Sequence, residues 1–447
     1  MRDNGDMSFL DRVVITNAKT VSQTSTGLGI GAGETWPGEL ALKLRPKIAS
    51  YFGKQFTKGV ILVVGTNGKT TTTLMIKKIL EANGNRVVHN ATGANLLNGI
   101  VSSCIRQTDW KGNLNADYGL FEVDENSFPI VLKYITPKRI VILNLFRDQL
   151  DRYGEVDVII EKWQRVLEDL PMQTEVMLNS DDPSVVYFGK LVKGKVTYFG
   201  LNDPKEYLKI AEHATDSTFC PQCGARLTYE GIYYSHIGIW HCEKCNLKRP
   251  IPDVYTFPKV LDGLYNQYNT LAAVALSKSL GIKESLIKQA LTSFVPAFGR
   301  QEEIVVDYPT SPADGGIRGA KRKVKLFLSK NPTGFNASLR TIIELGAKNV
   351  FLVLNDRIPD GRDVSWIWDV DFEMLPKHMR TIVSGDRIYD MALRLKYADV
   401  KIHVESDLEV GVRRAIVALP TQETLYILAT YSAMLDVRKI LTGKRIG

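Results

Sequence analysis

The sequence has few of the features that mark secreted, membrane-spanning or nucleic-acid-binding proteins. Five cysteines among 447 residues are too few for a disulfide scaffold, and their use fits a reducing, cytoplasmic compartment. The longest apolar runs, such as Val60–Val64 and Ile140–Leu143, are far shorter than the roughly 20 residues needed to span a bilayer. The first residues contain no long apolar segment, so we do not expect a signal peptide. Internal repeats and low-complexity tracts are also absent.

The charge is only mildly unbalanced. The sequence holds 57 Lys and Arg against 49 Asp and Glu, a net charge of +8, which suits an anionic substrate or a membrane surface and does not indicate nucleic acid. Apolar residues make up 44% and charged residues 24%, which excludes a disordered or fibrous chain. The length allows two or three domains, each with its own core.

The apolar pattern predicts a doubly wound α/β sheet over much of the chain. Val60–Val64 has the continuous, mostly β-branched character of a buried parallel strand. Lys69–Asn83 has helical spacing and stops at Asn83-Gly84, a common helix terminator. The same alternation of strand and helix continues at Tyr118–Val123, Arg139–Asn144, Glu155–Leu170 and Asn269–Leu280.

Two segments depart from this pattern. Residues 1–50 are rich in Gly, Ser and Thr and show little periodicity before Pro37. Residues 38–51 then read as a short amphipathic helix that is kinked or interrupted at Pro46. Residues from about 205 to 250 contain several aromatics and few long apolar runs, which predicts a small inserted module.

A second α/β region follows the first. Its strands are expected at Val324–Ser329, Asn349–Leu354, Arg380–Val383, Lys401–Val404 and Thr424–Thr430. We therefore predict an N-terminal segment (1–54), a central domain (55–303) that contains the inserted module, and a C-terminal Rossmann-like α/β domain (304–447).

The strand at 60–64 leads directly into the loop GTNGKTT, residues 65–71. Glycines let the backbone approach phosphate oxygens, and N–H groups at the start of the following helix point at the anion. Lys69 would reach the terminal phosphates, and the Thr70 hydroxyl would bind Mg²⁺. The alternative is an ordinary turn between strand and helix. The nucleotide-binding residues predicted here are Thr66, Asn67, Gly68, Lys69, Thr70 and Thr71.

This loop is shorter than a Walker A motif, which would place its first glycine where Val63 stands. The form GTNGKTT resembles that of the Mur ligases and folylpolyglutamate synthetases. Enzymes of that superfamily depend on ATP and join a carboxylate to an amine through an acyl phosphate. The resemblance therefore implies a Mur-ligase-type central ATPase domain.

Three further segments carry the same resemblance, which extends over residues 55–303. The family's Mg²⁺-binding glutamate matches Glu122 in FEVDE, and this hard cation prefers carboxylate oxygen. The adenine-binding segment matches GLYNQYNTLAA, in which Asn266 would contact the adenine. The G-R-x-E segment matches GRQE, in which Arg300 would contact the γ-phosphate and stabilise its developing charge.

Three departures indicate a subgroup of that superfamily. In NLFRDQLD, Gln149 stands where the family has a histidine that helps to bind a second metal. Only 64 residues precede the phosphate loop, where conventional Mur ligases carry a domain that binds the uridine nucleotide. The segment LSKNPTG, residues 328–334, lacks the Asp and His of the family's D-x-x-H-N-P motif. The resemblance thus implies a substrate other than a soluble UDP precursor and an amine from another source.

Four of the five cysteines form two CxxC pairs. The pairs are separated by 18 residues, which is a strong zinc-ribbon signal. A site of four thiolates is closed to water, so the zinc is predicted to be structural. The nearby His236 and His241 are not expected to be ligands, and Cys104 reads as an ordinary buried thiol. The predicted zinc ligands are Cys220, Cys223, Cys242 and Cys245.

Carboxylates and tryptophans cluster in NDRIPDGRDVSWIWD, residues 355–369, called the signature loop below. The cluster follows a predicted strand, where sites of α/β proteins lie, although an acidic loop with two anchoring tryptophans would read the same way. Together with the zinc ribbon, D-G-x-D-x-S-W-x-W-D resembles the MurT family, the ligase-like subunits of lipid II isoglutaminyl synthase. That resemblance implies a GatD-type glutaminase partner whose Cys and His lack a third triad member. Asp363, with Asp360 as the fallback, would supply it by orienting the partner's imidazole.

The resemblance implies ATP- and Mg²⁺-dependent amidation of the α-carboxylate of D-glutamate in the stem peptide of lipid II, using ammonia from the partner. Peripheral contact with the inner membrane face is expected, and the basic run at 318–325 is either a solvated hairpin or loop or a contact for anionic lipids. The alternative function is a Mur-type ligase that adds an amino acid without a glutaminase. A nucleic-acid-binding protein is disfavoured because the loop spacing differs and basic-aromatic patches are not evident.

Overall fold

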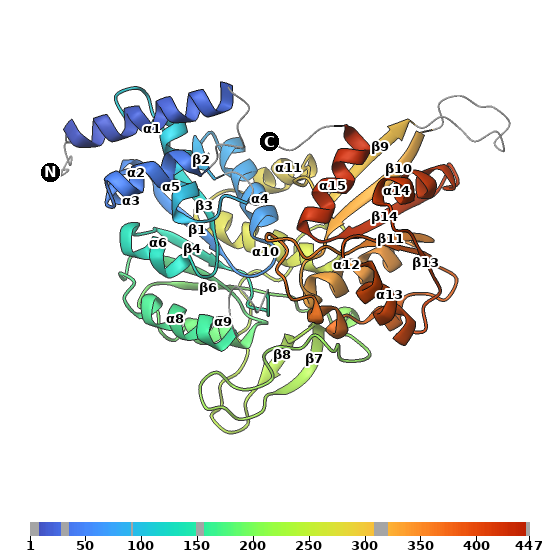
Figure 1. Ribbon diagram of the computed structural model, residues 1–447. Helices are drawn as coiled ribbons and strands as arrows, with labels where there is room; N and C mark the ends of the chain where they lie inside the picture. Colours follow the sequence, from blue (N-terminus) through green and yellow to red (C-terminus); the bar gives the residue numbers. More distant parts are fainter. Residues whose placement is uncertain (1–8, 28–34, 91–92, 149–155, 308–320, 444–447) are drawn as a thin grey trace.

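The computed structural model describes residues 9–27, 35–90, 93–148, 156–307 and 321–443. Two six-stranded sheets lie side by side, with a two-stranded hairpin below them (Figure 1). The first sheet has the order β2-β3-β1-β4-β5-β6, and every neighbouring pair is parallel. Its strands are β1 (Gly59–Val64), β2 (Val87–His89), β3 (Tyr118–Val123), β4 (Arg139–Ile142), β5 (Glu175–Asn179) and β6 (Val196–Phe199).

Helices cover both faces of this sheet, which is why β1 is apolar throughout. Leu62 and Val64 belong to one buried cluster, and Ile61 and Val63 belong to the cluster on the opposite face. The first cluster includes residues of α1 (Phe9–Gly27), α2 (Trp36–Leu44), α3 (Ile48–Gln55), α5 (Leu97–Gln107), α6 (Phe128–Tyr134), α8 (Val156–Glu168) and α9 (Pro183–Phe188). The second includes residues of α4 (Lys69–Ala82), α10 (Leu264–Ser279) and α11 (Glu284–Thr292).

The N-terminal region holds more regular structure than its weak periodicity indicates. α1 occupies part of the segment that shows no clear pattern. Among the residues of this helix whose burial the structure describes, the buried apolar ones are Val14, Ile15 and Ala18. This stripe is too narrow to stand out among Ser and Thr residues. The helix expected at 38–51 is two helices, α2 and α3, separated around Pro46, because a proline cannot continue a helix.

The second sheet has the order β13-β12-β11-β14-β10-β9, in which only the β9–β10 pair is antiparallel. Its strands are β9 (Arg300–Asp307), β10 (Lys321–Leu328), β11 (Asn349–Val353), β12 (Arg380–Ser384), β13 (Ile402–Val404) and β14 (Thr424–Ala429). Its helices are α12 (Pro332–Glu344), α13 (Ile388–Tyr397), α14 (Leu408–Val417), α15 (Tyr431–Thr442) and the 3₁₀ helices η3 (Ser365–Asp369) and η4 (Phe372–Met374). The predicted α/β class is confirmed.

The sequence pattern did not reveal β9, nor the strands β2, β5 and β6 of the first sheet and β7 and β8 of the inserted module. Because β9 begins at Arg300, the predicted boundary at 303 falls inside it, and the domain limits stay predictions. The described part of the basic run forms β10, one arm of a hairpin with β9, and it is only partly solvated. Arg322 is 5% exposed, and Lys325 Nζ lies 2.9 Å from Asp262 Oδ2. Arg318 and Gln149 lie outside the described residues.

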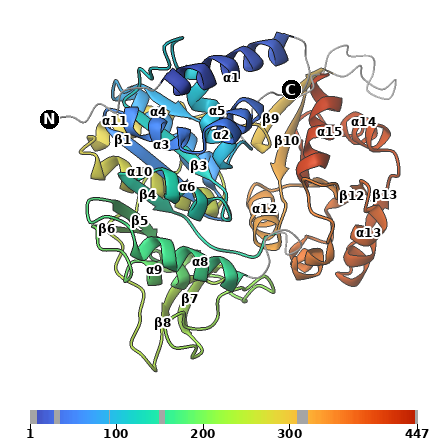
Figure 2. The same cartoon turned by 60° about the vertical axis from the view of Figure 1, so that its left-hand side comes forward.

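The inserted module lies between β6 and α10. It contains the 3₁₀ helix η1 (Pro204–Glu206) and the antiparallel hairpin of β7 (Thr228–Tyr234) and β8 (Ile237–His241). Both views place this hairpin at the lower edge of the molecule (Figures 1 and 2). Cys104, outside the module, is 1% exposed, as predicted for a buried thiol. In the part of the chain that the structure describes, no helix combines the length and apolarity needed to cross a membrane.

Candidate active site and metal centre

The loop between β1 and α4 lies where the first sheet changes direction. β1 is flanked by β3 on one side and β4 on the other, and doubly wound sheets bind ligands at such a point. Gly65 and Gly68 have φ values of 136° and 90°, which favour glycine. A Cβ at Gly68 would also lie only 2.0 Å from Asn269 Oδ1 of α10. Conformation and space therefore both require a glycine at the start of α4.

The loop is held in shape by the segment that follows β4. The Asn67 N–H donates to Asn144 Oδ1 at 2.9 Å, and Asn144 Nδ2 donates to the Asn67 carbonyl at 3.1 Å. Thr66 Oγ1 accepts from the Phe146 N–H at 3.0 Å and donates to the Phe146 carbonyl at 3.2 Å. Because these bonds are made within the protein, the backbone donors of the loop are positioned before phosphate binds.

The Lys69 amine is fixed inside this loop. It donates to the Gly65 carbonyl at 2.5 Å and pairs with Glu125 Oε2 at 3.1 Å. Burial opposes the charged amine, but the carboxylates of Glu125, Asp124 and Asp148 outweigh burial, so the pKa of Lys69 is raised. The amine is thus a permanent positive charge at the expected phosphate position.

Glu122 is the penultimate residue of β3, and one of its carboxylate oxygens has no hydrogen-bond partner among the described residues. Its side chain is 3% exposed, and this oxygen is Oε2. An unpaired buried carboxylate oxygen is costly, and a hard cation would satisfy it. Thr70, in the first turn of α4, lines the same cavity. These two residues therefore fit a Mg²⁺ ion, which would neutralise charge on the phosphates.

The second sheet supplies the opposite wall. Arg300 begins β9; burial lowers its pKa, while the Glu122 carboxylate acts in the other direction. The next residue, Gln301, has a φ of 63°, and its Nε2 donates to Tyr265 Oη at 2.7 Å and to the Asp262 carbonyl at 2.8 Å. Burial raises the pKa of Tyr265 to about 12. The start of β9 is thereby fixed against the start of α10.

One side-chain hydrogen bond and one ion pair connect the region of the phosphate loop to the beginning of α12. Asn331 caps that helix by accepting from the Gly334 N–H at 2.8 Å, and its Nδ2 donates to Asn67 Oδ1 at 3.1 Å. Lys330, the preceding residue, forms an ion pair with Asp148. The sequence gives no signal for either pair, because each joins residues that are far apart in the chain.

The residues predicted to bind nucleotide lie together in a cavity of about 680 Å³ between the two sheets. Sites for cofactors and similar ligands commonly measure about 300–1,000 Å³. The predicted residues that line this cavity are Thr66, Asn67, Gly68, Lys69, Thr70, Thr71, Glu122, Asn266 and Arg300. Their contacts to nucleotide and metal stay predictions.

Asn266 is 2% exposed and its amide is already engaged by the protein. Its Nδ2 donates to the Asp262 carbonyl at 2.7 Å, and its Oδ1 accepts from Asn269 Nδ2 at 3.1 Å. Because Asn269 lies against Gly68, Asn266 also helps to hold α10 beside the phosphate loop. Contact with adenine stays a prediction for this residue.

The two signature aspartates lie in different environments, and neither lines the cavity. Asp363 is exposed, and its Oδ1 accepts from the Ser365 N–H at 2.8 Å. Asp360 is 3% exposed; it accepts from the Ser432 N–H at 2.8 Å and from the Ser432 hydroxyl, and burial raises its pKa. Asp360 thus fixes the start of α15, and Asp363 is the more accessible of the two.

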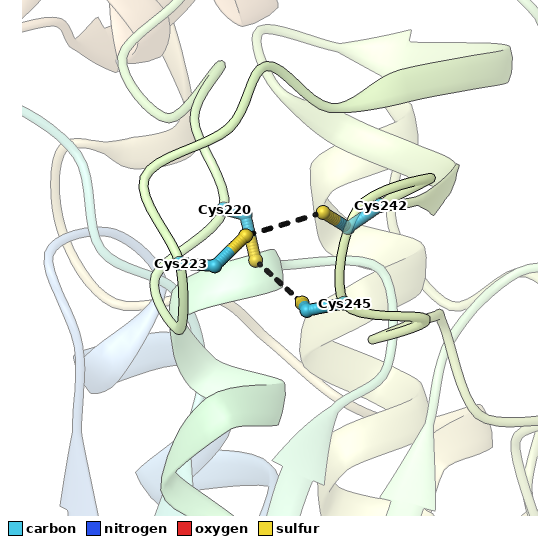
Figure 3. Close-up of side chains that lie close together, drawn as sticks. All are labelled: Cys220, Cys223, Cys242 and Cys245. Atoms are coloured by element: carbon cyan, nitrogen blue, oxygen red, sulfur yellow. Dashed lines mark hydrogen bonds between the residues drawn. The ribbon is translucent and has the colours of Figure 1, made fainter.

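The four predicted zinc ligands converge in the inserted module (Figure 3). Their Sγ atoms lie within 4.8 Å of one another, with Cys220–Cys245 and Cys223–Cys242 separations of 3.5 Å. A tetrahedral site with Zn–S distances of ~2.3 Å has sulfur–sulfur edges of about 3.8 Å, so the thiols fit zinc without rearrangement. This group of possible ligands contains only cysteines.

Both CxxC turns have the same backbone geometry. Gly224 and Asn246 follow the second cysteine of each pair, with φ values of 70° and 58°. The Gly224 N–H donates to the Cys220 carbonyl at 2.9 Å, and the Asn246 N–H donates to the Cys242 carbonyl at 3.0 Å. The left-handed residue turns each strand back so that both thiols of a pair face one point. Such matched turns support the predicted structural metal site.

Loss of the metal should disorder the module without unfolding the first sheet. We expect Cys242→Ser to reduce bound zinc and to make residues 205–250 sensitive to protease, because structural zinc contributes directly to local folding. Metal analysis and limited proteolysis of the full chain measure both effects. Cys104→Ser is the control, since this buried thiol lies outside the module and should leave zinc content unchanged. Undiminished zinc in the Cys242→Ser protein would contradict the predicted ligand set.

The module also joins the two halves of the molecule, which are the first sheet with its helices and the second sheet with its helices. Arg147, in the segment after β4, pairs with Asp216 of the module and, through Nη2, with Asp369 Oδ2 of η3 at 3.1 Å. Two neighbouring residues of the module, Glu212 and His213, pair with residues of the second half. Their partners are Arg340 in α12 and Asp371. The module therefore fixes η3 and α12 relative to the first sheet.

Replacing Arg147 by alanine should lower the free energy of unfolding by about 1–3 kcal/mol, because Asp216 would lose the cation beside its buried carboxylate. The Asp216 side chain is 4% exposed and that of Arg147 is 32% exposed, so solvent screens part of the loss. Asp369→Ala is the matched variant, and its 38% exposed carboxylate should contribute less than ~1 kcal/mol. Urea unfolding of both proteins measures the difference, and equal losses would contradict it.

The fold and the cavity define an ATP-dependent ligase of the Mur type. Residues 63–277 match the model of the Mur ligase middle domain. A solved pseudomurein peptide ligase type C from Methanothermus fervidus has a TM-score of 0.64 and 23% identity, covering 89% of this chain and 80% of that one. At that identity the likeness concerns the fold.

Relatives of higher sequence identity show to which family of Mur-type ligases the chain belongs. Residues 328–434 match the model of the MurT ligase C-terminal domain. The curated lipid II isoglutaminyl synthase (glutamine-hydrolyzing) subunit MurT of Staphylococcus aureus is 33% identical over 409 residues, 87% of this chain and 88% of that protein. The subunit of the same name from Streptococcus pneumoniae is 32% identical over 446 residues, 93% and 94% of the two chains. The chain belongs to the MurT family.

Proposed function

We propose that this chain is the synthetase subunit of a lipid II isoglutaminyl synthase. In this proposal it phosphorylates the α-carboxylate of D-glutamate in the stem peptide of lipid II, and ammonia from a GatD-type glutaminase converts the acyl phosphate to D-isoglutamine. The main support for this proposal is one cavity that is lined by the phosphate loop, Glu122 and Arg300 together with the start of α12 and the signature loop. The names of the MurT relatives support the choice of substrate.

The cavity suits phosphoryl transfer, which depends mainly on positioning and charge neutralisation. A carboxylate oxygen of the substrate would form a bond to the γ-phosphorus as the bond to the ADP oxygen breaks. Lys69 and Arg300 would stabilise the charge that develops on the phosphate. Thr70 and Glu122 would hold Mg²⁺.

Ammonia would then complete the reaction. Its nitrogen forms a bond to the carbonyl carbon while the carbon–oxygen bond to phosphate breaks, and phosphate leaves with the electron pair. A proton passes from the nitrogen to the phosphate or to water. The location follows from the substrate, so we propose a cytoplasmic enzyme in peripheral contact with the membrane that carries lipid II.

A Mur-type ligase that adds an amino acid is the competing function. It is less well supported, because LSKNPTG lacks the Asp and His of the amino-acid motif. At this place Lys330 pairs with Asp148, and Asn331 pairs with Asn67. These side chains link the two halves of the molecule and offer no equivalent of the missing residues.

The test is reconstitution with a candidate glutaminase. Co-purification of the two chains, followed by ATP-dependent amidation of lipid II with glutamine, would support the proposal. Ammonium chloride should replace glutamine in the absence of the partner. Addition of an amino acid to the carboxylate, without amide formation from either nitrogen source, would favour the competing function.

A further inference from the structure

The signature loop has two sides with different neighbours. Ile358 and Pro359 line the cavity of the phosphate loop. Asp363, five residues after Ile358, is exposed and lies outside that lining. One short loop therefore lines the ligase cavity with two residues and exposes the predicted triad aspartate outside that lining.

The separation between these sides is small. Five residues of fully extended chain span at most about 18 Å. The loop is not extended, because Gly361 has a φ of 86° and Asp360 turns inward to Ser432. The Cα atoms of Ile358 and Asp363 are therefore less than about 18 Å apart.

Several bonds hold the loop in this position. The Asn355 N–H donates to Thr430 Oγ1 at 3.0 Å, and Arg357 pairs with Asp386 and Asp436, each at 2.8 Å. The loop is thus attached to the ends of the strands and to α15 immediately before Ile358. Its apolar residues are placed by these contacts and do not depend on a bound ligand.

The signature loop contributes apolar side chains to the lining of the cavity. Ile358 is 77% exposed although it lines the cavity, so it stands at the mouth. Leu96, at the start of α5, also lines the cavity and is 47% exposed. Burial of an ion against apolar surface is expensive, so such a mouth favours passage of neutral ammonia over the ammonium ion.

We propose that ammonia enters the ligase cavity across the signature loop, past Ile358 and Pro359. A partner whose imidazole contacts Asp363 covers this mouth and releases ammonia beside it. This inference rests on the proposed function, because it assumes a glutaminase at Asp363. It adds the route by which the nitrogen reaches the acyl phosphate.

A bulky side chain at the mouth should uncouple glutamine hydrolysis in the partner from amide formation in this chain. In the assembled complex we expect Ile358→Trp to raise the glutamine hydrolysed per amide formed by roughly ten-fold, which corresponds to ~1.4 kcal/mol added to the barrier for passage. Glutamine hydrolysis itself should stay unchanged. Amidation by the subunit with excess ammonium chloride should fall less than glutamine-driven amidation, because excess ammonia in solution offsets a higher barrier to entry. Ile251→Trp is the matched control, because this isoleucine is 84% exposed and does not line the cavity.

Two results would overturn the route. One is a normal ratio of glutamine to amide in an assembled Ile358→Trp complex, and the other is an equal loss of glutamine- and ammonium-driven amidation. If the tryptophan variant does not bind the glutaminase, the Ile358→Ala complex provides the test. A smaller side chain at the mouth should let ammonia escape to solvent and so raise the glutamine hydrolysed per amide formed. A normal ratio of glutamine to amide in that complex would refute the route. If the wild-type protein forms no amide from either nitrogen source, the proposed function itself is wrong.

Discussion

Glu122→Gln should remove most of the ATP-dependent ligation, whichever nitrogen source is supplied. The change preserves the size of the side chain but takes away the negative charge beside which a cation would bind. We expect the rate to fall roughly 100- to 1,000-fold, the effect of removing one preorganised electrostatic group from a reaction that develops charge. Initial rates of amide formation with glutamine and with ammonium chloride, each over a range of Mg²⁺ concentrations, provide the measurement.

The structure offers a matched control for this variant. Glu175 also lies at the end of a strand of the first sheet, but at the amino end of β5, on the edge opposite to the phosphate loop. Glu175→Gln should therefore leave the Mg²⁺ dependence unchanged. If Glu122→Gln keeps both its rate and its Mg²⁺ dependence, the unpartnered Oε2 has no part in metal binding.

Asp363→Asn should affect amidation with glutamine and amidation with ammonium chloride differently. Asparagine keeps the shape of the side chain but cannot stabilise a cationic imidazole, so glutamine-driven amidation should fall by about 10³–10⁴-fold. Amidation with ammonium chloride should remain at the wild-type rate, because Asp363 does not line the ligase cavity. Parallel assays of glutamate release and amide formation in the complex measure the separation.

Asp360→Asn is the informative comparison, because this carboxylate binds Ser432 at the start of α15. We expect that variant to lose stability and to impair both nitrogen sources together. If Asp363→Asn also lost both activities, Asp363 would belong to the ligase reaction or to the fold. If it lost neither, the partner would draw its third triad member from elsewhere.

Much of this arrangement could be predicted from sequence, for identifiable physical reasons. Val60–Val64 predicts a buried parallel strand because a sheet covered on both faces requires apolar residues at every position. GTNGKTT and the two CxxC pairs are local motifs, in which the spacing along the chain alone determines the geometry. For these features, neighbours in sequence are neighbours in space.

The contacts between the halves could not be predicted in this way. Asn67 and Asn331 are 264 residues apart, and Lys330 and Asp148 are 182 residues apart. No local periodicity encodes such pairs, since each depends on where two separately folded sheets meet. β9 was also missed, because its buried and exposed residues alternate and it has no continuous apolar run like that of β1.

The inserted module also constrains how this chain can vary. Glu212, His213 and Asp216 are close in sequence, but each pairs with a different element outside the module. The cost of a substitution at Arg147 or Arg340 would therefore depend on the residue that faces it in the module. The segment that leads into the zinc ribbon and the junction between the two halves are thus expected to be epistatic, and a ribbon exchanged with a relative should carry residues 212–216 with it.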